Sequence, residues 1–189
     1  MGTQSVSKLD AAERQLHMAI LLYFQDVDPL GVHTLAGAAH GILEDLAVMQ
    51  NLQGKGTGVQ SGHRPYVTKM IENAKNFLKH ADRDPYDVLT FNPDWTDFLM
   101  FEAIHMYMSL AATLKLAHVI FLVWLSSKYP DVLLLDNTPL GAKAAEFKRL
   151  FPKLGDSIAE KKRTFYAGLI SHGLTLRGPM SSGAADAAR

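Results

Sequence analysis

The chain has 189 residues, of which 48% are hydrophobic and 20% are charged; this length suits one ordinary domain with a full core, and this usage excludes wholesale disorder and a fibrous repeat. Nineteen acidic residues balance nineteen basic residues, so no global field draws in polyanions and any contact with nucleic acid needs a local patch. The chain contains no cysteine, which excludes disulfides, thiolate metal sites and cysteine nucleophiles and fits a reducing compartment.

Neither the N-terminus nor the most apolar stretch has the pattern of a targeting or membrane segment. Residues 1–7 lead straight into charged residues with no apolar segment, so we expect a disordered N-terminus without a cleaved secretory signal. The stretch 109–125 carries Lys115 and His118 and falls short of the roughly 20 apolar residues that span a bilayer. We therefore expect a cytoplasmic protein with no membrane partner.

Two helices are predicted before residue 54. Ser7 is a typical N-cap, and apolar residues then recur at helical spacing over 8–25. Asp28 is a cap residue that is followed by a first-turn proline, and a second helix is expected over 30–53. Glycine costs about 1 kcal/mol relative to alanine inside a helix, so its repeated use predicts the close approach of a neighbouring backbone. The glycines concerned are Gly31, Gly37 and Gly41.

The rest of the chain alternates loops with further helices. Residues 54–63 are glycine-rich, which is typical of a flexible loop. The next helix begins at Pro65 and runs to about residue 81, before the stop at Asp82 to Pro85. Residues 95–127 are apolar on nearly all sides, which predicts one or two helices at the centre of a bundle.

Two more helices are expected over 137–151 and 155–172, and residues 177–189 have the composition of a disordered tail. Strand signals are too few to make a sheet. We therefore predict an all-α fold, a single domain over 8–176 that forms an antiparallel bundle of six or seven helices.

Some of the eight histidines have spacings that could direct ligands to a metal. His33, His40 and Glu44 lie within roughly 40° of one another around an ideal helix. Glu102 and His105 form a Glu-x-x-His pair, by which one helix offers a carboxylate and an imidazole to the same ion. One hypothesis is therefore a divalent transition-metal site made by these five residues. Alternatively, the histidines of the 30–53 helix are buried and hydrogen-bonded between helices.

A polar stripe is predicted near the end of the third helix. Asn73, Asn76 and His80 share one helical face at i, i+3 and i+7, which would direct two amides and an imidazole to one side. Cations and a carboxylate lie beside the stripe, a combination that suits an anionic group such as phosphate. We expect Asn73 to bind substrate together with Lys79, Asp82 and Arg83. In a purely structural alternative, these polar residues only cap and solvate the helix end.

The run Lys75-Asn76-Phe77-Leu78-Lys79-His80 resembles, loosely, the motif of the HEPN superfamily of small helical-bundle proteins. In that family an Arg, a polar residue that is often Asn, and a His after a four-to-six-residue gap form a metal-independent ribonuclease site; this chain has Lys75 in place of the Arg. The resemblance covers this motif and the bundle character of residues 8–127. It implies that His80 is a general acid and base, that Asn76 orients it or the phosphate, and that Lys75 neutralises developing charge. It also implies a homodimer with facing motifs.

The position of Lys75 on the helix limits how it could act together with His80. Lys75 lies about 140° from His80 around a regular helix, so the two would converge only at a distorted helix end or across a dimer. Our first prediction is accordingly an intracellular module that binds or cleaves RNA or a nucleotide without a cofactor. The alternatives are the metal-binding bundle and a non-catalytic interaction protein.

Overall fold

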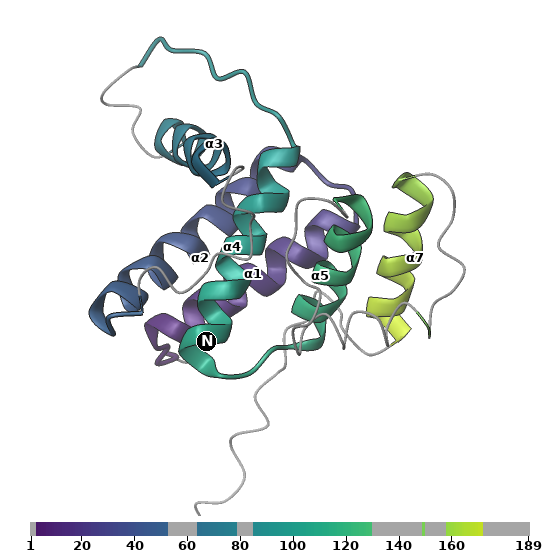
Figure 1. Ribbon diagram of the computed structural model, residues 1–189, viewed down its shortest axis with the longest axis horizontal. Coiled ribbons are helices and arrows are strands. Elements are labelled where there is room, and N and C mark those ends of the chain that lie inside the picture. The colour runs from purple at the N-terminus through teal and green to yellow at the C-terminus, as the bar shows by residue number, and fades with distance from the viewer. Residues whose placement is uncertain (1–2, 53–63, 79–84, 130–148, 150–157, 172–189) are drawn as a thin grey trace, which may run out of the picture.

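The computed structural model describes residues 3–52, 64–78, 85–129, 149 and 158–171. Every regular element in this part of the chain is an α-helix, which confirms the predicted all-α fold. The helices are α1 (Lys8–Phe24), α2 (Pro29–Met49), α3 (Arg64–Phe77), α4 (Asp94–Ala111), α5 (Leu116–Lys128) and α7 (Ile158–Ser171) (Figure 1). None of these helices is long and apolar enough to cross a lipid bilayer. The predicted loop 54–63, helix 137–151 and tail 177–189 lie outside the described residues, apart from residue 149.

The first two helices begin at the predicted caps. The Ser7 hydroxyl accepts a hydrogen bond from the backbone N–H of Asp10 at 3.0 Å. The Asp28 carboxylate accepts one from the N–H of Gly31 at 3.2 Å, ahead of the proline at the first helical position. These bonds satisfy N–H groups that have no partner within the helix. α2 ends at Met49, earlier than predicted, and Asn51 already has a left-handed φ of 54°.

The apolar stretch 95–127 forms two helices. Ala112 has a φ of 54° and ends α4, and α5 then runs back along it. The rings of Tyr107 and His118 lie 5.0 Å apart between centroids at one end of this hairpin. At the other end, Lys128 Nζ lies 2.6 Å from an Asp94 carboxylate oxygen. The α4–α5 pair is therefore antiparallel, as the short connection predicts.

The core lies between α1, α2, α4 and α5, with α3 beside α2 and α4, and α7 beside α5 (Figure 1). α2 and α4 run in the same direction, because His33 bonds to Thr96 and Gly37 faces Leu99 further along both helices. The bundle thus contains a parallel pair as well as antiparallel hairpins. Among the largest side chains fully withdrawn from solvent are Trp124, Phe101, Phe121, Leu16, Ile20 and Met100.

The glycines of α2 do not mark a close backbone approach. A Cβ added at Gly37 would lie 3.9 Å from the Leu99 side chain, and one added at Gly31 would lie 3.8 Å from the Asp28 carboxylate. Both distances are ordinary van der Waals contacts with side chains, and neither involves a neighbouring backbone. The prediction from glycine spacing was therefore wrong at these two positions.

Candidate functional site

A cleft of about 460 Å³ lies between the end of α3 and the segment that leads into α4. We call it the α3 cleft. α3 contributes Asn73, Asn76 and Phe77, the facing segment contributes Asp87, Val88, Leu89 and Thr90, and the first turn of α4 contributes Trp95. The two amides line the same cleft, as their i, i+3 spacing predicted. The facing wall was not predicted, because no periodic pattern connects it to α3.

Local sequence explains how each wall of the α3 cleft is held. Ile71 and Ala74 are buried in the core, which leaves Asn73 and Asn76 exposed on the other side of the helix. In the facing segment, the Asp87 carboxylate accepts a hydrogen bond from the N–H of Val88 at 2.9 Å. Such side-chain-to-backbone bonds stabilise turns without regular secondary structure.

Two large apolar side chains beside the α3 cleft are left in solvent. Tyr86 is 95% exposed and Val88 is 84% exposed. Single exposed apolar residues are common on protein surfaces. Val88 lines the cleft, which also offers amide and hydroxyl groups, and Tyr86 directly precedes Asp87 of its wall. A ring exposed to this extent is available to stack on a ligand.

Lys75 faces away from the α3 cleft, toward α2. Its ammonium lies 3.1 Å from the Glu44 carboxylate and 3.3 Å from that of Glu72, and its side chain is only 11% exposed. Burial acts to lower the pKa of Lys75, but the two carboxylates outweigh it and hold the pKa above its usual value. The charge of Lys75 is thus met within the protein. This corrects the role expected for Lys75, because the contact joins two helices and the ammonium is not presented to a phosphate in the cleft.

The other residues of the predicted stripe lie beyond the described part of α3. His80, Lys79, Asp82 and Arg83 fall within residues 79–84, outside the described ranges. Their roles therefore stay predictions. The separation of Lys75 from the Asn73 and Asn76 side of α3 agrees with the angle expected for a regular helix.

The histidines of the metal hypothesis are engaged in other contacts. His33 is fully buried, its Nδ1 lies 3.0 Å from the Thr96 hydroxyl, and burial lowers its pKa to about 4. His105 Nδ1 donates to the Phe101 carbonyl at 3.0 Å, and His40 Nδ1 lies 3.8 Å from a Glu44 carboxylate oxygen. Within the described residues no three His, Asp or Glu side chains gather as metal ligands. The shared site predicted from spacing is therefore not formed by His33, His40, Glu44, Glu102 and His105.

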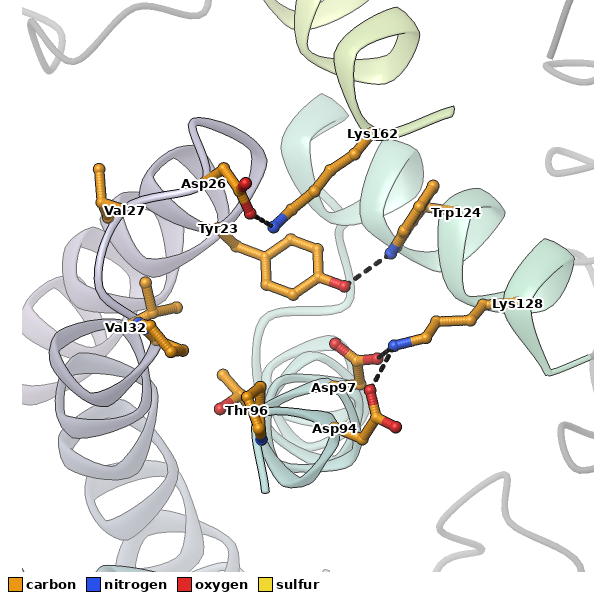
Figure 2. Close-up of a pocket in the computed structure, with 12 residues that line it drawn as sticks. Tyr23, Asp26, Val27, Val32, Asp94, Thr96, Asp97, Trp124, Lys128 and Lys162 are labelled. Carbon is orange, nitrogen blue, oxygen red and sulfur yellow. Dashed lines mark hydrogen bonds and ion pairs between the residues drawn. The ribbon is translucent and has the colours of Figure 1, made fainter. Parts of the chain in front are cut away.

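A second cavity, of about 380 Å³, was not predicted at all. It lies between the α1–α2 connection, the first turn of α4, the end of α5 and α7 (Figure 2). We call it the Tyr23 pocket. Its walls include the apolar residues Val27, Pro29, Val32 and Pro93, the aromatic Tyr23 and Trp124, and polar or charged Asp26, Asp94, Thr96, Asp97, Lys128 and Lys162.

Separate groups of hydrogen bonds line the Tyr23 pocket (Figure 2). The Trp124 indole donates to the Tyr23 hydroxyl at 2.8 Å. Lys128 donates to Asp94 at 2.6 Å and to Asp97 Oδ2 at 2.7 Å, and the latter oxygen also accepts from the Tyr129 hydroxyl at 3.1 Å. Burial raises the pKa of Asp97, and the Lys128 ammonium opposes the rise. In the sequence, this site was indicated by the carboxylate of Asp97, which lies in the otherwise apolar stretch 95–127.

Comparisons of the chain with protein families, with curated proteins and with solved structures find no match. The residues of the α3 cleft and the Tyr23 pocket are therefore the basis for assigning a function.

Proposed function

We propose that the protein binds single-stranded RNA or a nucleotide at the α3 cleft. The observation that carries this proposal is the pair of carboxamides, Asn73 and Asn76, in one cleft with the Trp95 indole and next to the exposed Tyr86. A carboxamide both donates and accepts hydrogen bonds, so two of them can pair with the edge of a nucleobase.

The aromatic residues supply the second requirement of nucleobase binding. Unpaired bases stack on exposed aromatic rings, and each stacked base contributes about 1–3 kcal/mol. Tyr86 offers such a ring beside the cleft, and Asp87 offers a carboxylate that can accept from ribose hydroxyls. We assign the phosphates to Lys79 and Arg83, since the cleft itself contains no cation among its described residues.

Binding is the activity that we propose, with cleavage as a separate step. In a HEPN-type reaction His80 would act as general acid and base, and Asn76 would orient it. Lys75, however, is neutralised by Glu44 and Glu72 and does not line the cleft. Without a free cation at that position, developing charge on the phosphate lacks the stabilisation that the family motif provides.

Fluorescence anisotropy tests the binding proposal. A labelled single-stranded RNA of about 12 nucleotides is titrated with wild-type protein, and ATP is added as a competitor. We expect the Asn73→Ala/Asn76→Ala double variant to bind at least about tenfold more weakly and Tyr86→Ala several-fold more weakly. Ser109→Ala is the matched control: Ser109 is exposed at the far end of α4, about 20 Å from Trp95. Binding by the double variant at wild-type affinity, or none by folded wild type, would refute the proposal.

Two further measurements test RNA cleavage and homodimer formation separately from binding. Incubation of the RNA with wild type and with His80→Ala, followed by gel analysis, tests cleavage: loss of full-length RNA with wild type alone would assign a catalytic role to His80. Light scattering during size-exclusion chromatography tests the homodimer that the HEPN resemblance implies.

A further inference from the structure

The Tyr23 pocket has a different composition from the α3 cleft and lies on another side of α4. Trp95 faces the α3 cleft, whereas its neighbours Asp94 and Thr96 face the Tyr23 pocket. No residue lines both cavities. A ligand of the Tyr23 pocket would therefore be recognised independently of RNA or nucleotide binding.

Asp97 is a buried carboxylate in the wall of the pocket. The Asp97 side chain is 1% exposed, and its Oδ2 accepts from Lys128 and Tyr129. Its Oδ1 is buried and has no hydrogen-bond partner among the described residues. Figure 2 shows this carboxylate directed toward the Tyr23 hydroxyl and the open centre of the pocket, and burial together with the Asp97 carboxylate raises the pKa of Tyr23. Because a buried acceptor without a donor is costly, Oδ1 marks where a ligand donor would be stabilised.

The charges around the pocket favour a cationic ligand. Three carboxylates, those of Asp26, Asp94 and Asp97, face two ammonium groups, those of Lys128 and Lys162. Both ammonium groups are already paired, Lys162 with Asp26 at 2.6 Å and Lys128 with the other two carboxylates. An anionic ligand would have to displace these pairs and approach Asp97. A cation would instead find an unsatisfied carboxylate oxygen.

The walls favour an organic cation with an apolar body. Val27 and Val32 form an apolar side opposite the Asp97 carboxylate, and Pro29 also lines the pocket. The volume of about 380 Å³ lies in the range of small-molecule sites, roughly 300–1,000 Å³. A bare metal ion would gain nothing from this apolar side. It would also lie near the Lys128 ammonium, and the described residues contain no cluster of metal ligands.

We propose that the Tyr23 pocket binds a small primary amine with an apolar body. Its ammonium group donates to Asp97 Oδ1, and its apolar body packs on Val27 and Val32. The ligand enters at the rim formed by Asp26, whose side chain is 83% exposed, and Val27, which is 41% exposed.

Isothermal titration calorimetry with three probes of similar shape tests this proposal. We expect 2-phenylethylamine hydrochloride to bind with a dissociation constant below about 1 mM, 2-phenylethanol to bind at least about tenfold more weakly because it lacks the charge, and phenylacetate not to bind. The indole N–H signal of Trp124 in an NMR spectrum should shift at lower concentrations of the amine than of the alcohol and should not shift with phenylacetate, since Trp124 lines the pocket.

Variants assign the binding to the pocket. Asp97→Asn should lower amine affinity at least about tenfold, while Asp45→Asn, an exposed carboxylate on α2, should leave it unchanged. Should Asp97→Asn fail to fold, Val27→Trp at the rim should block the amine without altering the core. The proposal is overturned if the amine does not bind, if the alcohol binds equally well, or if folded variants with Asp97→Asn or Val27→Trp bind the amine as wild type does.

Discussion

Lys75 on α3 and Glu44 on α2 are 31 residues apart in the sequence, and their charged groups lie 3.1 Å from each other. The contact joins two helices that the chain connects only through residues 50–63. It also fixes which side of α3 faces the core: Lys75 and Ile71 turn toward the protein, and Asn73 and Asn76 turn toward the α3 cleft. One ion pair thus helps to set the orientation of the proposed binding surface.

We predict that Lys75→Met lowers stability but leaves RNA affinity within about twofold of wild type. Methionine keeps most of the buried aliphatic stem, so mainly the ion pairs are lost. Because Glu44 and Glu72 are 49% and 44% exposed, the free energy of unfolding should fall by only about 1 kcal/mol. Urea denaturation and RNA anisotropy measure the two effects. A tenfold loss of RNA affinity with unchanged stability would restore the phosphate-binding role predicted from the motif.

The Asp97–Lys128 ion pair predicts which of two substitutions destabilises the protein more. Lys128→Met leaves the buried Asp97 without its cation and should cost about 3 kcal/mol. Asp97→Asn should cost less, because Asp94 still pairs with Lys128 and a buried charge is removed. Urea denaturation near neutral pH checks the order, and the reverse order would show that Asp97 is not the buried charge that depends on Lys128.

Local signals were sufficient for much of the fold. The caps at Ser7 and Asp28 could be recognised because a cap bonds to residues two or three positions away. The shared face of Asn73 and Asn76 also follows from helical periodicity alone. Periodicity did not reveal that the stretch 95–127 divides into two helices at Ala112. A stretch that is apolar on nearly all sides shows no polar face whose break would mark the end of a helix.

The remaining parts of the candidate sites depend on contacts between distant segments. Helical spacing placed His33 and His40 on one face but could not show that Thr96 would occupy the His33 imidazole. The pair of Asp97 and Lys128, 31 residues apart, becomes visible only when α4 and α5 fold back on each other. For the same reason, the HEPN resemblance assigned Lys75 to a phosphate, whereas its ammonium pairs with Glu44 on α2.

Two buried histidines predict a loss of stability in mild acid. Burial lowers the pKa of His33 to about 4 and that of His118 to about 3, whereas both titrate near 6.5 in the unfolded chain. Below pH 6.5 the unfolded chain therefore binds protons that the folded chain does not, and the free energy of unfolding decreases. Near pH 5 each histidine should contribute a loss of about 2 kcal/mol.

Urea denaturation near pH 7 and near pH 5, with wild type and His33→Gln, measures this effect. Glutamine cannot titrate, so the difference in stability between the two pH values should shrink by about 2 kcal/mol in the variant. The quantity to compare is the change in the free energy of unfolding between pH 7 and pH 5. The lost bond to Thr96 lowers stability at both pH values and therefore cancels in this change. An equal pH dependence in the two proteins would show that His33 is protonated in the folded state.

Gly37 on α2 predicts a stabilising substitution. The position is buried within a helix, and an added methyl group would meet only the Leu99 side chain, at 3.9 Å. Alanine removes backbone freedom from the unfolded chain and adds apolar contact, so Gly37→Ala should raise the free energy of unfolding by about 0.5–1 kcal/mol. Gly31→Ala is the comparison, because the added methyl group would lie 3.8 Å from Asp28, whose carboxylate caps α2 through the Gly31 N–H. We expect little gain there. If Gly37→Ala instead destabilises the protein, α2 and α4 pack too tightly for a methyl group, as the glycine pattern first indicated.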